Sequence, residues 1–167
     1  MSMASVAPRW MALLVLLPAL LLPVSAFQMG YVEVNVGGQG DAAVQVDYTL
    51  TWVEYVGVFL GIANPVRELQ KALSEYSGTT VNVTTVSAES AGFQVEQFAR
   101  ISTTEGRLVY TTPALTFSDA ERKLQSYWFA PLISPDLSPE VTVIRFPDGY
   151  VETFQNESRI PSLSHLV

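Results

Sequence analysis

Hydrophobic and polar residues alternate without interruption from Val44 to Trp52. Every second residue in this stretch is apolar, and most of these are β-branched or aromatic, whereas the residues between them are Gln, Asp and Thr. A period of two predicts a β-strand with one buried face, because successive side chains of a strand point to opposite sides. The predicted buried face consists of Val44, Val46, Tyr48, Leu50 and Trp52.

A second alternating stretch, Met29–Val36, comes shortly before the first. The glycine-rich segment Gly37–Asp41 separates the two, and glycine is favoured in tight turns. The two stretches therefore predict an antiparallel hairpin. Tyr55–Ala63 continues the apolar character with two glycines inside it, a composition that fits either a bulged strand or a loop packed under the core.

Two stretches have the periodicity and the end signals of helices. Asn64 and Pro65 are typical of a helix start, and Gly78 is typical of a helix end. Ser118 and Glu121 have the spacing of a capping box, which predicts a second helix with Ser118 as its N-cap. The predicted apolar sides are Val66, Leu69, Leu73 and Tyr76 in the first helix, and Ala120, Leu124, Tyr127 and Trp128 in the second.

Five further stretches predict strands, and the elements together follow the order ββ-α-βββ-α-ββ. This order indicates an α+β fold of about seven mostly antiparallel strands, with two helices packed on one face of the sheet. Residues 27–155 form a single predicted domain, and residues 156–167 are expected to be a flexible tail. The five stretches are Thr79–Val86, in which the alternation slips at Thr84–Thr85, Gly92–Ile101, Arg107–Leu115, Val141–Phe146 and Tyr150–Phe154. A turn through Thr104–Gly106 is predicted to join the second and the third of them.

The N-terminal segment has the layout of a secretory signal peptide. Arg9 precedes the aliphatic run Met11–Leu22, and Val24–Ala26 presents small residues where a signal peptidase cleaves. The run is shorter than the ~20 residues that span a bilayer and contains Pro18, which favours cleavage after Ala26 over retention as an anchor. We expect residues 1–26 to be removed and the protein to be secreted or to lie on the extracytoplasmic cell surface. A membrane would be a partner only if the segment is retained.

Charge and residue types exclude several classes of function. The formal net charge of −7 disfavours nucleic acid and anionic lipid as partners. The absence of cysteine excludes disulfides, thiolate catalysis and cysteine-ligated metals. The single histidine, His165, lies in the predicted tail, where the fold would not hold a general base in place. We assign no catalytic residue, no metal site and no cofactor.

Carboxylates are the remaining candidates for catalysis. Asp41, Glu105, Asp136 and Asp148 all lie in predicted turns, where polar residues and glycine are favoured for backbone reasons alone. A hydrolase with two catalytic carboxylates requires a pair at about 5–10 Å. Sequence spacing does not establish such a pair, so this enzyme class is the third interpretation of the chain.

Two kinds of surface feature are predicted instead. Asn82 and Asn156 each begin an Asn-X-Ser/Thr triplet, the acceptor pattern for N-glycosylation in an exported protein. Apolar and aromatic residues also concentrate in two segments, which form either core or a patch for a ligand or a partner. The residues of this patch are Tyr55, Phe59, Leu60, Tyr127, Trp128 and Phe129.

The leading hypothesis is a non-catalytic, secreted or cell-surface domain that acts by contact with another surface protein or with itself. The alternative is an exported carrier or sensor that binds an apolar ligand between the sheet and the helices. The two hypotheses make different demands on the fold. The first needs an exposed contact surface, and the second needs an apolar cavity.

Overall fold

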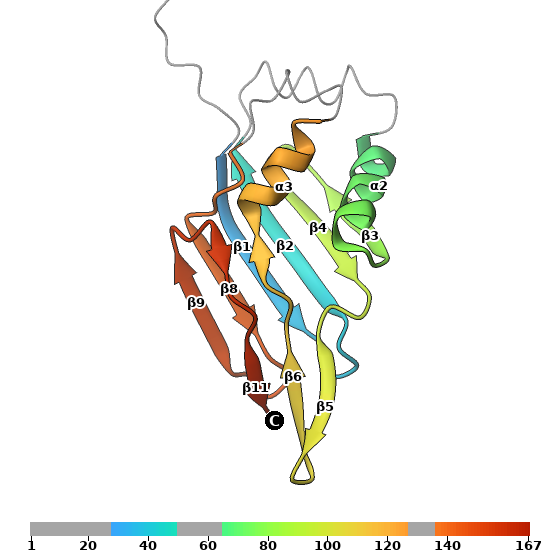
Figure 1. The fold of residues 1–167 in the computed structure, drawn as a ribbon. Helices are drawn as coiled ribbons and strands as arrows, with labels where there is room; N and C mark the ends of the chain where they lie inside the picture. Colours follow the sequence, from blue (N-terminus) through green and yellow to red (C-terminus); the bar gives the residue numbers. More distant parts are fainter. Residues whose placement is uncertain (1–27, 50–64, 127–135) are drawn as a thin grey trace, which may run out of the picture.

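The computed structural model describes residues 28–49, 65–126 and 136–167, which form two helices and eleven strands. Figure 1 shows a six-stranded sheet with both helices and the smaller strands in front of it. The order of strands in the large sheet is β3-β4-β2-β1-β8-β9. The elements are β1 (Gln28–Val36), β2 (Ala42–Thr49), α2 (Pro65–Ser77), β3 (Val81–Val86), β4 (Ser90–Val95), β5 (Arg100–Thr104), β6 (Arg107–Thr111), β7 (Leu115–Thr116), α3 (Phe117–Leu124), β8 (Val141–Arg145), β9 (Val151–Gln155), β10 (Arg159–Ile160) and β11 (Ser164–Leu166).

The predicted first hairpin is confirmed, because β1 and β2 pair antiparallel along their whole length. Val32, Val34 and Val36 are buried on one face, as their alternation predicts. The turn contains Gly40 with a φ of +87°, a conformation that favours glycine. The predicted continuation of the second strand to Trp52 lies outside the described residues.

The large sheet contains one parallel pair, which the sequence does not predict. β1 runs parallel to β8, with Val34 opposite Ile144. Parallel neighbours need a long crossover connection, and the whole chain from β2 to β8 forms it. The other pairs in this sheet are antiparallel.

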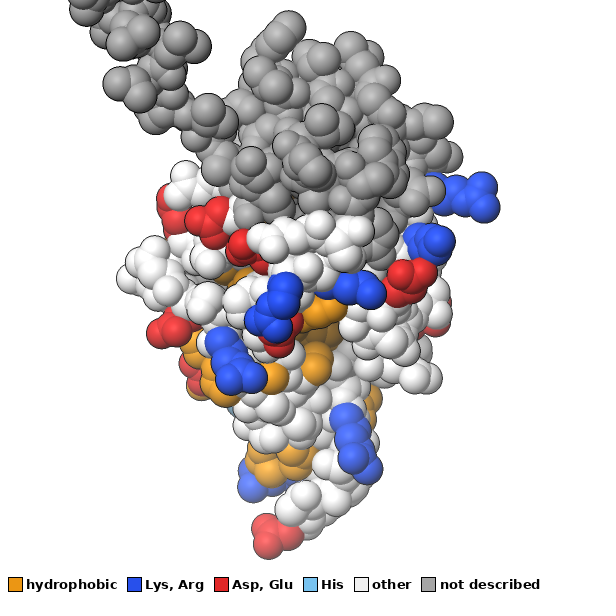
Figure 2. Space-filling model, turned by 45° about the horizontal axis from the view of Figure 1, so that its top comes forward, with side chains coloured by type: hydrophobic (Ala, Val, Ile, Leu, Met, Phe, Trp, Pro, Cys, Tyr) orange, Lys and Arg blue, Asp and Glu red, His pale blue; other side chains and the backbone are white. Residues whose placement is uncertain are grey.

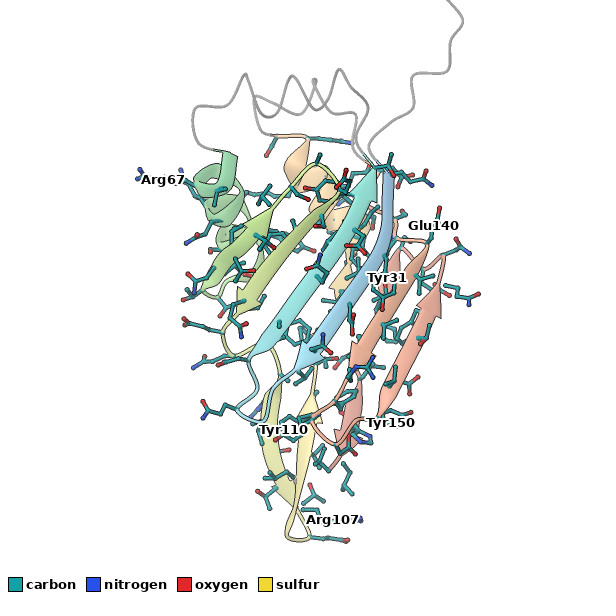
Figure 3. The ribbon with its side chains drawn as sticks, turned by 180° about the vertical axis from the view of Figure 1, so that it is seen from behind. Tyr31, Arg67, Arg107, Tyr110, Glu140 and Tyr150 are labelled. Atoms are coloured by element: carbon teal, nitrogen blue, oxygen red, sulfur yellow. The ribbon has the colours of Figure 1, made fainter. Side chains whose placement is uncertain are left out.

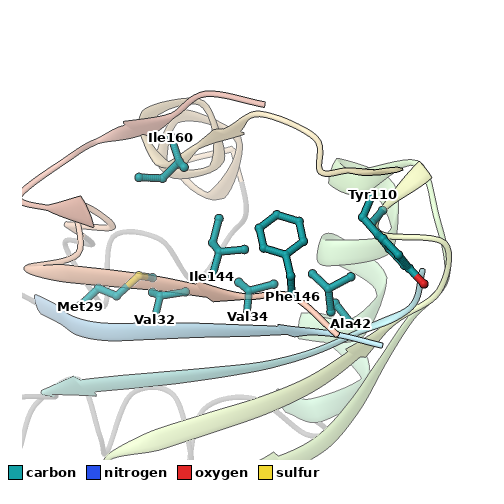
Figure 4. Close-up of a cluster of buried hydrophobic side chains, with 10 residues drawn as sticks. Met29, Val32, Val34, Ala42, Tyr110, Ile144, Phe146 and Ile160 are labelled. Carbon is teal, nitrogen blue, oxygen red and sulfur yellow. The ribbon is translucent and has the colours of Figure 1, made fainter. Parts of the chain in front are cut away.

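The core lies between the large sheet and the layer in front of it. Figure 4 shows Ile160 above Ile144 and Phe146, with the sheet strands below. Ile144 and Ile160 are fully buried, and Val34 is 1% exposed. The buried hydrophobic cluster consists of Met29, Val32, Val34, Val36, Ala42, Ala99, Tyr110, Ile144, Phe146 and Ile160.

The mixed fold of helices and mainly antiparallel strands is confirmed, but the described residues contain eleven strands rather than about seven. The predicted strand Gly92–Ile101 is in fact two strands, β4 and β5. The chain turns between them at Gln97, which has a φ of +50° and donates its N–H to Oδ1 of Asp41 at 2.9 Å. Arg107–Leu115 likewise divides into β6 and β7, and Pro113 lies in the break.

The capping box predicted for the second helix is wrong. Helix α3 begins at Phe117, and its N-cap is Thr116, which has an extended backbone and makes no side-chain cap hydrogen bond. The N–H of Phe117 instead donates to the carbonyl oxygen of Ser158 at 3.0 Å. The first N–H of the helix is thus satisfied by a carbonyl group just before β10, far away in the sequence, and not by a nearby side chain.

The apolar side predicted for the first helix is also partly wrong. Val66 and Tyr76 of α2 are 39% and 42% exposed, whereas Ala72 is buried. The helix packs on the edge strand β3. The Tyr76 hydroxyl donates to the carbonyl oxygen of Thr116 at 2.9 Å, which links α2 to the start of α3. Neither helix in the described residues is long and apolar enough to span a membrane.

The C-terminal segment is part of the fold, in contrast to the flexible tail predicted for residues 156–167. β10 pairs with β7, and β11 pairs with β6. Ile160 is fully buried, so the segment supplies part of the core. The sequence did not show this because strands of two and three residues are too short to produce a recognisable alternation.

Candidate functional site

A three-stranded sheet formed by β5, β6 and β11, which we call the ribbon, consists mainly of exposed residues. Figure 1 shows the hairpin of β5 and β6 projecting beyond the end of the large sheet. Figure 3 shows Tyr110 near the root of this hairpin and Arg107 at its tip. Tyr110 is buried, and its hydroxyl donates to the carbonyl oxygen of Gly38 at 2.9 Å. This contact fastens the ribbon to the turn between β1 and β2.

Hydrophobic side chains continue along the inner face of the ribbon after it has left the core. Tyr110 points into the core, and Ile101 lies opposite it on β5. Leu108 lies two residues further along β6 on the same face, and the N–H of Val167 donates to its carbonyl oxygen at 2.8 Å. Ile101, Leu108 and Val167 are 37%, 42% and 37% exposed. The inner face therefore presents apolar surface where no described element packs on it.

The outer face of the ribbon combines apolar and basic side chains. Arg100 and Arg107 lie on this face, together with Val109 and Leu166, which are opposite one another. Figure 2 shows hydrophobic side chains on the front of the hairpin, with basic side chains on either side of them. Glu105, at the turn, is the one acidic residue of the hairpin. The ribbon is thus locally basic on a chain whose formal net charge is −7.

A cluster of aromatic and acidic side chains holds the ribbon on the side of β11. The ring of His165 on β11 stacks on Tyr150 with centroids 4.2 Å apart, and its centroid is 4.9 Å from that of Phe146. Nε2 of His165 lies 2.8 Å from Oδ2 of Asp148 in the turn between β8 and β9. The expectation that His165 lies in a loose tail is therefore wrong, because its side chain is only 20% exposed.

Electrostatics within this cluster shift two pKa values. The hydrogen bond with His165, and then the bond from the backbone N–H of Tyr150, lower the pKa of the Asp148 carboxyl below its usual range. The Tyr150 hydroxyl donates to Glu152, and this bond raises the pKa of Tyr150 because it favours the protonated phenol. The hydrogen bonds thus favour the ionised carboxylate of Asp148 and the protonated phenol of Tyr150.

Ser164 is not placed to act as a nucleophile with His165 as its base. Ser164 is next to His165 in sequence, but it points to the opposite side of β11, and its Oγ lies 3.0 Å from Oγ1 of Thr111. A catalytic serine must instead lie within hydrogen-bond reach of the base that activates it. The contact between His165 and Asp148 joins β11 to the turn between β8 and β9.

Of the turn carboxylates predicted as catalytic candidates, Asp41 and Asp136 also have structural roles. Asp41 accepts the backbone N–H of Gln97 at 2.9 Å, and Asp136 accepts that of Ser138 at 3.0 Å. Glu105 lies at the exposed hairpin turn with a φ of +52°. Among the residues the structure describes, no three carboxylate or histidine side chains come together as a metal site.

The structure places both glycosylation candidates at the surface. Asn82 is exposed on the edge strand β3, and the neighbouring Val81 points inward and is buried, as predicted. Asn156 is exposed at the end of β9 with a φ of +55°. The predicted patch of Tyr55, Phe59, Leu60, Tyr127, Trp128 and Phe129 lies outside the described residues.

Sequence reasoning did not identify the ribbon as a candidate site. The sequence predicts that Arg107–Leu115 is a strand of the main sheet. The apolar residues of such a strand would form its buried face. The available signal was the sequence Thr104–Gly106, which correctly predicts the hairpin turn. Exposure of the hairpin depends on the length of the strands packed against it, and no local pattern encodes that length.

Two hollows of the described surface are open and are lined mainly by polar residues and glycine. The first is lined by Asn35, Gly37, Gly38, Gln39, Asp41, Ala43 and Gln94, and the second by Ser74, Glu75, Gly78, Thr79, Thr80, Glu96 and Gln97. Neither has the apolar lining that a site for an apolar ligand needs. Comparisons with protein-family models, with curated proteins and with solved structures each found no match to this chain.

Proposed function

We propose that this protein is a secreted or cell-surface domain without catalytic activity that acts by binding another protein through the ribbon. The supporting observation is the clustering of exposed apolar residues. Six of the eight large hydrophobic residues exposed in the described parts of the chain lie on the ribbon or at the adjoining start of β9. Exposed hydrophobic residues are common singly, whereas a cluster marks an interaction site. The six are Ile101, Leu108, Tyr150, Val151, Leu166 and Val167.

The composition of the ribbon indicates the kind of partner. Arg100 and Arg107 flank the apolar residues of the outer face. Arginine is enriched in protein interfaces and pairs well with carboxylates, while charged residues are depleted at the apolar centre of an interface. The partner surface that fits best is therefore an apolar patch with acidic residues at its rim.

The extracytoplasmic location is part of the proposal and is supported by the signal-like segment and by the exposure of both acceptor asparagines. We expect the protein recovered from the soluble fraction of its native cells to begin at Phe27 and to carry extra mass at Asn82, Asn156 or both. Intact-mass measurement with peptide mapping tests this directly. A membrane-bound species that retains Met1 would contradict secretion and identify Met11–Val24 as an anchor.

Leu108→Asp is expected to weaken partner binding about tenfold or more, because it places a charge among the exposed apolar residues of the inner face of the ribbon. Leu108 is 42% exposed, so the free energy of unfolding should change little. The measurement uses the immobilised protein as bait for the extracellular proteins of its native cells. Proteins retained by the wild type are then quantified on the variant.

The matched control is Val66→Asp, which introduces the same charge at a similarly exposed hydrophobic residue on α2. The control should retain the same partner as the wild type. Equal retention by Leu108→Asp and Val66→Asp would contradict the ribbon as the contact surface. Retention of no protein by the wild type would contradict the proposed function itself.

A carrier function is the second candidate, and one observation favours it. Val44, Val46 and Phe93 lie on the inner face of the large sheet and are only half-buried, unlike the corresponding residues of β1. They form an apolar strip between the sheet and the layer of helices. A carrier would release a bound apolar molecule on organic extraction of the purified monomer, whereas a contact domain would release none.

A further inference from the structure

The outer strand of the large sheet, β9, has an unpaired edge in the described part of the molecule. β9 pairs with β8 on one side, and it is the last strand in the order of the sheet. Figure 1 shows no strand on its outer side. An unpaired edge presents free N–H and C=O groups, which form a template for pairing with another strand.

The hydrogen bonds at the two ends of β9 determine which backbone groups are free. The N–H of Phe146 donates to the carbonyl oxygen of Tyr150, and the N–H of Asn156 donates to that of Glu140, both at 2.8 Å. Bonded pairs alternate along an antiparallel ladder, so Glu152 and Phe154 also point their backbone groups at β8. The residues between them, Val151, Thr153 and Gln155, therefore point their N–H and C=O groups outward.

We propose that β9 pairs antiparallel with β9 of a second copy of this chain, with Thr153 opposite Thr153, so that two six-stranded sheets join edge to edge. This register also pairs Val151 with Gln155 of the other copy. Each pair exchanges two hydrogen bonds, so all the outward groups of the strand are satisfied, with about six bonds in total. Sliding the copies by two residues leaves one outward residue of each strand unpaired.

The side chains of β9 are compatible with this pairing. The strand contains no lysine and no proline, and its register with β8 has no bulge. Its single charged residue, Glu152, lies on the inner face, where it accepts a hydrogen bond from Tyr150. In the proposed register Glu152 is opposite Phe154 of the other copy, so no like charges are directly opposite one another.

The edge at the other end of the sheet is protected against pairing, whereas the edge of β9 is not. β3 has a bulge between Val83 and Thr85, where the sequence alternation slips, and α2 packs against the strand. Asn82, the candidate glycan acceptor, is exposed on it. Bulges and covering elements protect an edge against pairing. A second copy therefore meets β9 rather than β3, and the resulting two-fold arrangement closes as a dimer instead of growing into a filament.

Thr153→Pro is the first test, because proline removes the outward N–H at the centre of the pairing and leaves the bonds to β8 intact. The dissociation constant of the dimer, measured by sedimentation velocity over a concentration series, should rise at least about tenfold. Thr153→Val keeps the backbone N–H and is the matched control, which should dimerise like the wild type. A wild type that stays monomeric at its highest soluble concentration would overturn the proposal.

Two double variants that introduce charges test the register. Their outcome does not depend on whether β9 tolerates a proline. Val151→Lys with Gln155→Lys places lysines opposite one another in the proposed dimer, and Val151→Glu with Gln155→Glu does the same with carboxylates. Each variant alone should be monomeric at concentrations where the wild type is dimeric, and an equimolar mixture should regain the dimer mass. Dimerisation of both variants alone, or no recovery in the mixture, would contradict the register.

This inference goes beyond the proposed function, because it concerns a strand edge rather than the exposed apolar residues of the ribbon. The variants described above distinguish the dimer from the contact function of the ribbon. If Leu108→Asp abolishes partner retention while the wild type is monomeric, the contact function holds and the dimer fails. If the charge variants behave as expected while the wild type retains no partner, the dimer holds and the ribbon function fails.

Discussion

Replacing Ile160 by alanine is expected to lower the free energy of unfolding by about 2–5 kcal/mol. Ile160 is fully buried and belongs to the same cluster as Ile144 and Phe146. The substitution removes burial of the side chain and leaves a cavity between two layers, and both effects destabilise the folded state. Urea unfolding followed by circular dichroism gives the free energy directly. The effect is large because Ile160 is the fully buried residue that β10 contributes to the core.

The matched control is Ile101→Ala, which deletes the same atoms at a residue that is 37% exposed. Its expected cost is below about 1 kcal/mol. A similarly small cost for Ile160→Ala would mean that the C-terminal segment is not packed in solution as it is in the structure. In that case the ribbon would also lose β11, because the same segment leads into that strand.

Gly40→Ala is expected to lower the free energy of unfolding by about 3 kcal/mol or more, since two costs add. A non-glycine residue at the φ of +87° is strained, which costs about 1–3 kcal/mol. A β-carbon at Gly40 would also lie 2.4 Å from the carbonyl oxygen of Ala99, so the backbone before β5 has to move. The N–H of Ala99 donates to the carbonyl oxygen of Gly40 at 2.7 Å, and that movement would break the bond.

Gly149→Ala separates the two costs. Gly149 has a φ of +88°, almost the same as Gly40, but a β-carbon there meets no atom within 4 Å. We expect this control to cost about 1 kcal/mol, from backbone strain alone. Equal unfolding free energies for the two variants would contradict the close approach of Gly40 and Ala99. A larger cost for Gly40→Ala would confirm that this approach holds the root of the ribbon.

The sequence by itself determined the elements whose signals are local. Alternation in Met29–Val36 predicted β1 and its buried face, and the slip in alternation at Thr84–Thr85 coincides with the bulge that the structure shows in β3. Asn64 and Gly78 bracketed helix α2, and Thr104–Gly106 marked the turn of the ribbon. These signals work because side-chain periodicity and glycine conformation depend on neighbouring residues only.

Only the tertiary structure decided the features that depend on distant partners. The parallel contact of β1 with β8, the burial of Ile160 and the fastening of His165 to Asp148 all join segments far apart in the chain. Very short strands gain their stability from the strand beside them, so their own residues carry almost no pattern. The exposure of the apolar face of the ribbon also depends on segments that are distant in the sequence. Its residues alternate like those of any buried strand, and they are exposed because the ribbon extends beyond the sheet that covers its root.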